Sequence, residues 1–371
     1  GAPSLTLSFQ QDQSFSENLS YSGSKIIIDV TGYTLDTSGF DITTSSSAIG
    51  GDITLKADHL ILSGNTLVDT RGASGSFGDI NLEAVIDNKI FFGGFLDLDF
   101  IDVDITIGND VSIFGGDVRI IATANSTAVV NPDDVGNEYL ALALDQGLQT
   151  VVGGLLETLS PFSVAVAKSY ADIEIGSATI SAESLTVNAN ANISILAESL
   201  LGSTPLAIGV GDTRATVTVD ANIHTQTEAY FTADILNLMR VGADSGAING
   251  ISAALAVAIL DSYAAVHLTD ASSVTVDDGD MLVRAKITDQ TKTGAASSAT
   301  DTYTRPTDTP NARGMQARDL EDGAVSFSFA IMVENSLAEA FVDGQVDINK
   351  TVGTGNVDIS AEVQQIPIVA F

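Results

Sequence analysis

The chain has 371 residues, of which 44% are hydrophobic, 6% are aromatic and none is Cys, so disulfides, thiolate metal sites and cysteine nucleophiles are excluded. With 48 Asp and Glu against 15 Lys and Arg, the formal net charge is -33. Such a charge repels nucleic-acid phosphates and anionic membranes, and we expect neither as a partner. The most apolar stretch, residues 248–260, is too short to span a bilayer, so we also expect no membrane insertion.

Alternating apolar residues predict a series of strands in the N-terminal part, residues 1–130. Three apolar triplets with period two each end in Ala and each follow a Gly-Asp pair. They are Ile53-Leu55-Ala57, Ile80-Leu82-Ala84 and Val118-Ile120-Ala122. Strict alternation indicates strands with one buried face. The Gly-Asp pairs predict turns in which Gly supplies a positive φ.

A longer motif begins at residue 50 and restarts 27 residues later. Its successive pieces are GGDITLKA (50–57), LILSG (60–64), DTRG (69–72) and GDINLEA (78–84). This pattern resembles the repeats of filamentous haemagglutinin, with the best match over residues 50–84. The resemblance implies a right-handed parallel β-helix within a large exported bacterial adhesin or a related surface protein.

Residues 131–162 interrupt the strand pattern and predict a helical insertion. Their apolar residues recur with helical spacing, and Pro161 ends the run. These apolar residues are Leu140, Leu144, Leu148, Val151, Val152, Leu155 and Leu156. Asp133 and Asp134 are candidates for the helix N-cap.

A repeated unit fills residues 163–287 and returns in the final segment, residues 324–371. Each copy has an apolar pair, then Ser or Thr, then an alternating triplet whose leading Ala lies seven residues after the first apolar residue. The four copies are residues 164–175, 208–219, 257–268 and 331–342, and their polar residues are Ser169, Thr213, Ser262 and Ser336. A second triplet that ends in Ala closes each copy. The spacing leaves parallel and antiparallel pairing of these units open.

Between these copies, residues 288–323 are rich in Thr, Asp and Ser and contain Pro306 and Pro310. We expect an exposed loop insertion there. The chain is therefore predicted to be all-β: an elongated parallel β-helix or β-solenoid with one helical insertion and one long polar loop. Repeat folds accept insertions of this kind between units.

Signals for catalysis are sparse, and we predict no catalytic residue and no enzyme. The histidines, His59, His224 and His267, lie in strand patterns without ligand spacing, and we expect outward-facing strand residues. A row from Asp97 to Asp104 would project carboxylates from one strand face if a bulge near Ile101 resets the phase.

Calcium is the one cofactor that the sequence suggests, because Ca²⁺ prefers several hard oxygen ligands at turns. The candidate ligands are the acidic residues of two turn-like segments. They are Asp277, Asp278, Asp280, Asp133 and Asp134.

The composition and the resemblance together predict a non-enzymatic structural or adhesive segment, extracellular and on the bacterial cell surface. Its expected partner is a cell-surface or matrix ligand. One alternative is a subunit of a self-assembling filament, with copies of the chain end to end. A less favoured alternative is a β-helix enzyme that acts on polysaccharides, which would need aromatic sugar platforms that this chain supplies poorly.

Overall fold

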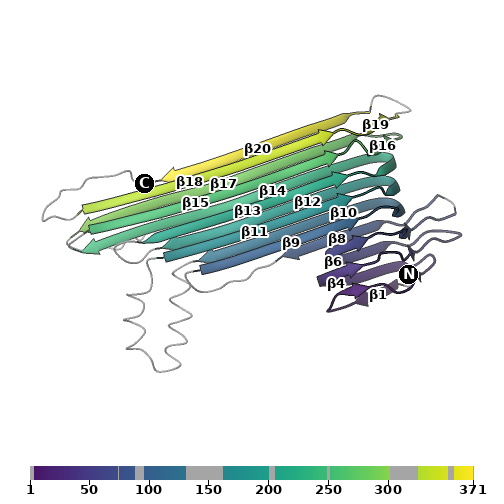
Figure 1. The fold of residues 1–371 in the computed structure, drawn as a ribbon, viewed down its shortest axis with the longest axis horizontal. Coiled ribbons are helices and arrows are strands. Elements are labelled where there is room, and N and C mark those ends of the chain that lie inside the picture. The colour runs from purple at the N-terminus through teal and green to yellow at the C-terminus, as the bar shows by residue number, and fades with distance from the viewer. Residues whose placement is uncertain are drawn as a thin grey trace, which may run out of the picture.

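A computed structural model of the chain describes residues 4–73, 75–87, 96–130, 162–199, 205–248, 251–300, 325–349 and 355–370. Within these ranges the regular elements are β-strands (Figure 1). The strands are β1 (Ser4–Ser8), β2 (Gln13–Ser14), β3 (Leu19–Ser20), β4 (Lys25–Asp36), β5 (Ile42–Thr43), β6 (Ile53–Leu62), β7 (Leu67–Asp69), β8 (Ile80–Asp87), β9 (Leu96–Ile107), β10 (Ser112–Val130), β11 (Phe162–Ile175), β12 (Thr179–Ser199), β13 (Leu206–Val219), β14 (Asn222–Ile248), β15 (Ile251–Leu268), β16 (Ser273–Val276), β17 (Met281–Thr300), β18 (Val325–Val342), β19 (Gln345–Ile348) and β20 (Val357–Ala370). No helix in these ranges is long and apolar enough to cross a membrane.

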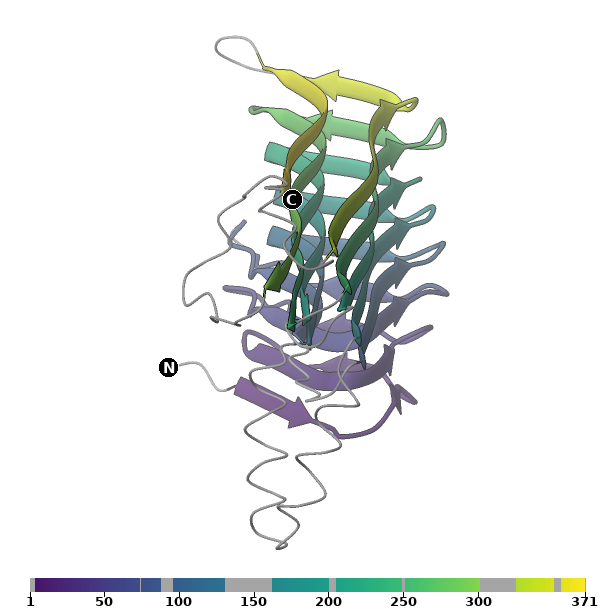
Figure 2. The same cartoon turned by 90° about the vertical axis from the view of Figure 1, so that its left-hand side faces the viewer.

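The strands stack as coils, and each pairs in parallel with the equivalent strand of the next coil. One series runs β4–β6–β8–β10–β12–β14–β17–β20, and its last five strands form what we call the β12 face. A second series, β9–β11–β13–β15–β18, forms the β11 face. Short pairings such as β14–β16 and β16–β19 make a third side. Figures 1 and 2 show the coils rising from β1 at one end to β20 at the other. The predicted β-solenoid is confirmed, and pairing in the second half is parallel.

The triplets that end in Ala align in register across seven coils. Ala84 pairs with Ala57 on one side and with Ala122 on the other, and the series continues to Ala361. The larger residues of the same triplets, such as Ile53 and Leu82, are fully buried. Burial of each such side chain contributes about 1.5–3 kcal/mol, so the ladder is a main source of stability.

The Gly-Asp turns lie where the sequence predicts them, but their backbone conformation differs from the predicted one. Neither Gly51 nor Gly78 has a positive φ. A Cβ on Gly51 would lie 2.1 Å from the Ser24 carbonyl oxygen, and one on Gly78 would lie 2.3 Å from that of Gly51. Glycine is needed there because stacked turns touch backbone to backbone, not because of φ.

Each long coil encloses two apolar cores. The proximal core lies within the three-sided part and contains large residues such as Ile28 and Ile173. The distal core lies between those parts of the β11 and β12 faces that extend beyond the three-sided part, toward the left in Figure 1. There the β11 face contributes small inward residues such as Ala165 and Gly211. A Cβ on Gly211 would lie 2.3 Å from Ile193 Cδ1, so the two faces approach closely in this half.

The predicted loop over residues 288–323 is wrong at its start, because β17 continues to Thr300. Asp289, Thr291 and Thr293 are polar, yet they are buried and alternate with outward residues of the same strand. This polar run is therefore part of a strand, and its alternate polar side chains face the interior. The remainder of that loop, residues 301–323, lies outside the described residues, as does the predicted helical insertion up to residue 161.

Candidate functional site

A layer of buried polar side chains separates the proximal core from the distal core. On the β11 face, the Ser and Thr positions of the repeated unit form a column in register, from Ser169 through Thr213 and Ser262 to Ser336. Ser169 Oγ donates to the Ala124 carbonyl oxygen across the interior at 2.7 Å. The spacing of the sequence units located this column correctly.

Asn237 and Asp289, on the β12 face, complete the polar layer and are fully buried. Asn237 Nδ2 lies 2.7 Å from Asp289 Oδ1, 2.8 Å from Ser262 Oγ and 3.2 Å from Thr213 Oγ1. Ser336 Oγ donates to Asp289 Oδ2 at 2.5 Å. Such a network acts within a low dielectric and fixes one arrangement of the facing strands.

The Asp97 to Asp104 row does not form one acidic surface. β9 pairs with β11 without a register shift, so the bulge expected near Ile101 is absent. Asp97 and Asp99 point inward and are buried, whereas Asp102 points outward. The expectation failed because continuous pairing with β11 keeps strict alternation along the whole strand.

Asp97 and Asp99 instead bind the backbone of β10. Thr127 N donates to Asp99 Oδ2 at 2.7 Å, and Val129 N donates to Asp97 Oδ2 at 2.8 Å. These amides lie in the part of β10 beyond Asn125, where the pairing with β8 ends. No other described strand pairs with β10 on that side beyond Asn125, and the two carboxylates accept the hydrogen bonds of its amides there. Burial raises the pKa of Asp97, with Asp99 adding to this effect.

The candidate calcium ligands Asp277, Asp278 and Asp280 lie in the turn that joins β16 to β17. Asp277 Oδ2 lies 2.8 Å from His224 Nε2, and Asp280 Oδ1 accepts a hydrogen bond from Asn356 N at 2.9 Å. Asp133 and Asp134 lie outside the described residues. In the part of the chain that the structure describes, no three His, Cys, Asp or Glu side chains are grouped to hold a metal. Calcium binding stays a prediction.

Each histidine lies in a strand and contacts an aspartate of a neighbouring coil. The pairs are His59 with Asp104, His224 with Asp277 and His267 with Asp343. The hydrogen bond to Asp104 raises the pKa of His59, against the opposing effect of burial. The prediction of outward strand residues is confirmed, and each contact joins two neighbouring coils.

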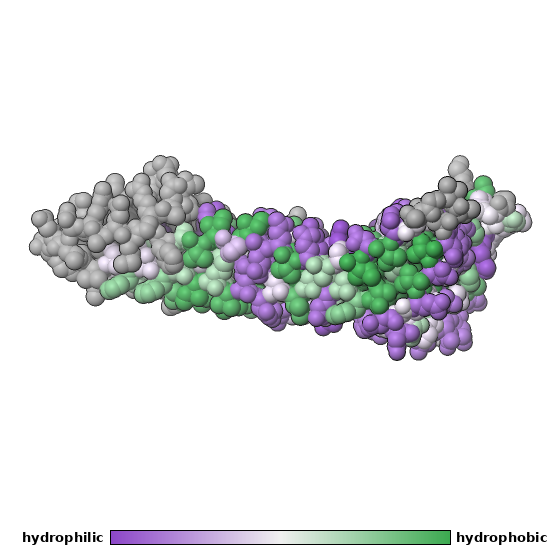
Figure 3. All heavy atoms as spheres, turned by 90° about the horizontal axis from the view of Figure 1, so that it is seen from above, coloured by the Kyte–Doolittle hydropathy of each residue, from purple (hydrophilic) through white to green (hydrophobic). Residues whose placement is uncertain are grey.

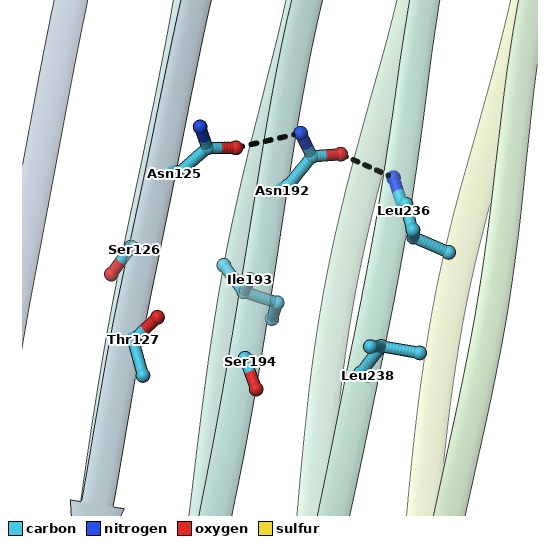
Figure 4. Close-up of a pocket in the computed structure, with 8 residues that line it drawn as sticks. All are labelled: Asn125, Ser126, Thr127, Asn192, Ile193, Ser194, Leu236 and Leu238. Atoms are coloured by element: carbon cyan, nitrogen blue, oxygen red, sulfur yellow. Dashed lines mark hydrogen bonds between the residues drawn. The ribbon is translucent and has the colours of Figure 1, made fainter. Parts of the chain in front are cut away.

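A shallow depression of about 140 Å³ lies on the outer side of the β12 face (Figure 4). Its lining is neutral: Asn125, Ser126, Thr127, Asn192, Ile193, Ser194, Leu236 and Leu238. Asn192 Nδ2 donates to Asn125 Oδ1 at 2.8 Å, and Leu236 N donates to Asn192 Oδ1 at 3.1 Å. These amides are used to link three coils, and the lining offers no acid, base or nucleophile of shifted pKa.

The C-terminal end of the stack is a further candidate site. In the last coil, Val357, Ile359 and Val363 are 45%, 48% and 42% exposed, whereas their partners one coil earlier, among them Met281 and Ile287, are at most 1% exposed. Figure 3 looks onto this end and shows green apolar side chains open to view among purple ones.

These inward-facing side chains are exposed because, among the described strands, β18 pairs with β15 alone and β20 pairs with β17 alone. The end therefore combines an apolar ladder with unpaired backbone, the two components that hold every other pair of coils together. Comparisons with protein-family models, with curated proteins and with solved structures found no match to this chain.

Proposed function

We propose that this chain is a non-enzymatic structural segment of a large extracellular bacterial surface protein, and that its C-terminal end coil is a stacking surface for a further parallel coil. The observation that carries this proposal is the exposed inward ladder of β20. Val357, Ile359 and Val363 each continue an inward column, and their partners one coil earlier are at most 1% exposed.

The backbone edge supports the same function. A row of unpaired N–H and C=O groups on a long parallel strand is a template for another strand. β18 and β20 together present such edges along both faces of the coil. A partner strand in register would satisfy these groups and cover the half-exposed apolar side chains at about 25 cal/mol per Å².

The N-terminal coil of a second molecule is a suitable partner. Leu5 and Leu7 of β1 pair with Ile26 and Ile28 of β4 and so begin the inward columns that end in Val357 and Ile359. Stacking an N-terminal coil on a C-terminal coil is a head-to-tail contact, which generates an open filament rather than a closed ring. In a longer polypeptide, the same end would receive the next coil of that polypeptide, and a cell-surface or matrix ligand would bind along the rod.

The test is the length of the particles as a function of concentration. Negative-stain images and sedimentation velocity should show rods that join end to end as the concentration rises. Val363→Lys places a charge in the inward column of the end coil and should reduce this association at least tenfold. Gln364→Lys, the next residue on the outward side of the same strand, is the matched control and should leave it unchanged. Rods of a single length at every concentration, or equal behaviour of the two variants, would contradict the stacking function.

A further inference from the structure

The outer side of the β11 face carries two complete rows of aliphatic side chains, which we call the aliphatic face. Each row contains one residue from each of five strands, and strand pairing sets the rows in register. The rows are Leu96, Val164, Ile208, Val257 and Ile331, and Leu98, Val166, Val210, Ile259 and Val333. Every one of these ten side chains is exposed or half-buried on the outside of the solenoid.

The same strands have small residues on their inner side. Ala165, Ala207 and Ala256 point into the distal core, so the larger side chain of each neighbouring pair points outward. A parallel strand that is apolar on both sides is typical of a sheet that is covered on both faces. The outer side of the β12 face beside the distal core differs, because polar residues such as Ser194 and Arg240 interrupt it. The aliphatic face is therefore a property of one sheet and not of the fold in general.

A polar boundary ends the aliphatic face on its proximal side. The next outward row contains Lys168, Asp212 and Asp261. Lys168 Nζ lies 3.2 Å from Asp212 Oδ2 and 5.9 Å from the centre of the Phe100 ring. An apolar centre with a polar rim is the usual anatomy of a protein interface.

The aliphatic face is broad, and its side chains on the outer strands β9 and β18 are well exposed. Leu96, Leu98 and Val333 are each about half exposed, at 52%, 48% and 52%. Phe327 and Phe329 extend the apolar area on β18, at 49% and 60% exposed. Five strands about 4.8 Å apart make a flat surface roughly 20 Å wide. A soluble monomer rarely exposes an apolar patch above about 300–600 Å², and a standard interface covers about 800 Å² on each partner.

We propose that two copies of this chain pair side by side through their aliphatic faces. The two rows contain no charged side chain, so a partner must be flat, apolar and uncharged over the same area. A second aliphatic face meets each of these conditions, and a two-fold pair requires a patch that is complementary to itself. Two sheets packed in this way lie about 10 Å apart, with aliphatic side chains interleaved.

The charge of the chain gives lateral pairing a distinct salt response. Two chains of formal charge -33 repel each other, and the contact itself adds no ion pair within the two rows. Salt screens this repulsion and leaves the apolar contact intact. The side-by-side pair should therefore become tighter as ionic strength rises.

Sedimentation equilibrium of the Val363→Lys chain tests this pairing separately from end-to-end stacking. This chain should form dimers, more strongly at high salt. Val210→Lys, in the central strand of the aliphatic face, should weaken the dimer at least tenfold, and the near-isosteric Val210→Thr should weaken it several-fold. Ser194→Lys, on the outer side of the β12 face, is the matched control and should pair normally. Far-UV circular dichroism and melting confirm that each variant is folded.

Cross-linking gives a second readout, because the chain has no Cys. A single Val210→Cys should form a disulfide-linked dimer on mild oxidation, and Ser194→Cys should not. A Val363→Lys chain that stays monomeric at high salt would overturn the proposal, as would a dimer that Val210→Lys leaves intact. Binding of the monomer to neutral phosphatidylcholine vesicles, lost in Val210→Lys, would assign the face to a lipid surface and would also overturn it. In a chain that carries Val210→Lys without Val363→Lys, side-by-side pairing should be lost while end-to-end joining is unchanged. This result would show that the two contacts are independent.

Discussion

The proximal and distal halves of the long coils use the same alternating strand in opposite ways. In the proximal half of β11, the large Ile173 points inward and the charged Asp172 points outward. In the distal half of the same strand, the small Ala165 points inward and the larger Val164 points outward. The strand pairs with β13 without a register shift throughout. Alternation alone therefore does not say which side of a strand is the core.

The shape of the coil explains the difference. Three sides enclose the proximal core, so large side chains are needed to fill the space between them. Two sheets enclose the distal core, and Ile193 and Met239 of the β12 face already fill much of it. The β11 face then contributes mostly Ala and Gly, with Leu260 as a larger exception, and most of its large residues remain outside. The polar layer with Asn237 and Asp289 marks the boundary between the two halves.

The proximal half should be sensitive to a loss of side-chain volume, and the distal half to a gain of it. Leu82→Ala in the proximal core should lower the free energy of unfolding by about 2–5 kcal/mol, because it leaves a cavity. Ala256→Leu in the distal core should also destabilise, by about 1–3 kcal/mol, because it overpacks a thin interior. Urea unfolding followed by circular dichroism measures both effects.

Val257→Ala is the matched control, since Val257 neighbours Ala256 but points outward. At low salt and high dilution, where the Val363→Lys chain is monomeric, this change should alter its free energy of unfolding by less than about 1 kcal/mol. A distal core that accepts Ala256→Leu at no cost would remove the distinction between the two halves.

The boundary layer should respond to single and double substitution differently. Asn237→Leu leaves the buried Asp289 carboxylate with the Ser336 hydroxyl but without its amide donor, and should lower stability by about 1.5–3 kcal/mol. Replacement of both residues by Leu should recover much of this loss, because no buried acceptor is left without a donor. Chemical denaturation of the two single variants and the double variant measures the coupling.

Asn190→Leu provides the control for this pair of residues. Asn190 lies on the outer side of β12, and its hydrogen bond to Thr123 is long at 3.4 Å. A change below about 0.5 kcal/mol is expected there. Equal losses of stability for Asn237→Leu and Asn190→Leu would mean that the buried polar layer contributes no more to stability than an outward-facing asparagine.

The smallest expected effect is a pH dependence confined to the proximal half, where the histidines lie. The folded-state pKa of His59 is raised by its hydrogen bond to Asp104. A raised histidine pKa stabilises the folded state fully below the ordinary value near 6.5, and this contribution is lost as the pH rises through the folded pKa. The side chain is 38% exposed, so solvent screening keeps the effect below about 1 kcal/mol.

Hydrogen exchange at pH 6 and pH 9, corrected for intrinsic rates, should show weaker protection of the Leu60 amide at the higher pH. The Val241 amide in the distal half should show no such change, and His59→Gln should remove the difference at Leu60. A pH response of equal size at both amides would assign it to other groups.

The candidate site was only partly predictable from sequence. The Ser and Thr column was located by spacing, because residues at equal offsets in equal units stack in register. Its partners Asn237 and Asp289 could not be located by spacing, because only the stacking of coils brings them opposite that column. The aliphatic face was missed, although the seven-residue offset from Val164 to Ala171 is odd and places these residues on opposite sides of one continuous strand.

The sequence by itself determined that this protein is a stack of strands, that its units repeat with matched offsets and that each closes with Ala. Period-two alternation and repeat spacing are local properties, so they can be read along the chain. Only the tertiary structure decided which side of each strand is inside, where polar side chains are buried together and that Gly51 and Gly78 serve close stacking. These outcomes depend on the distance to the facing sheet and on the neighbouring coil, which are set by residues far away in the chain.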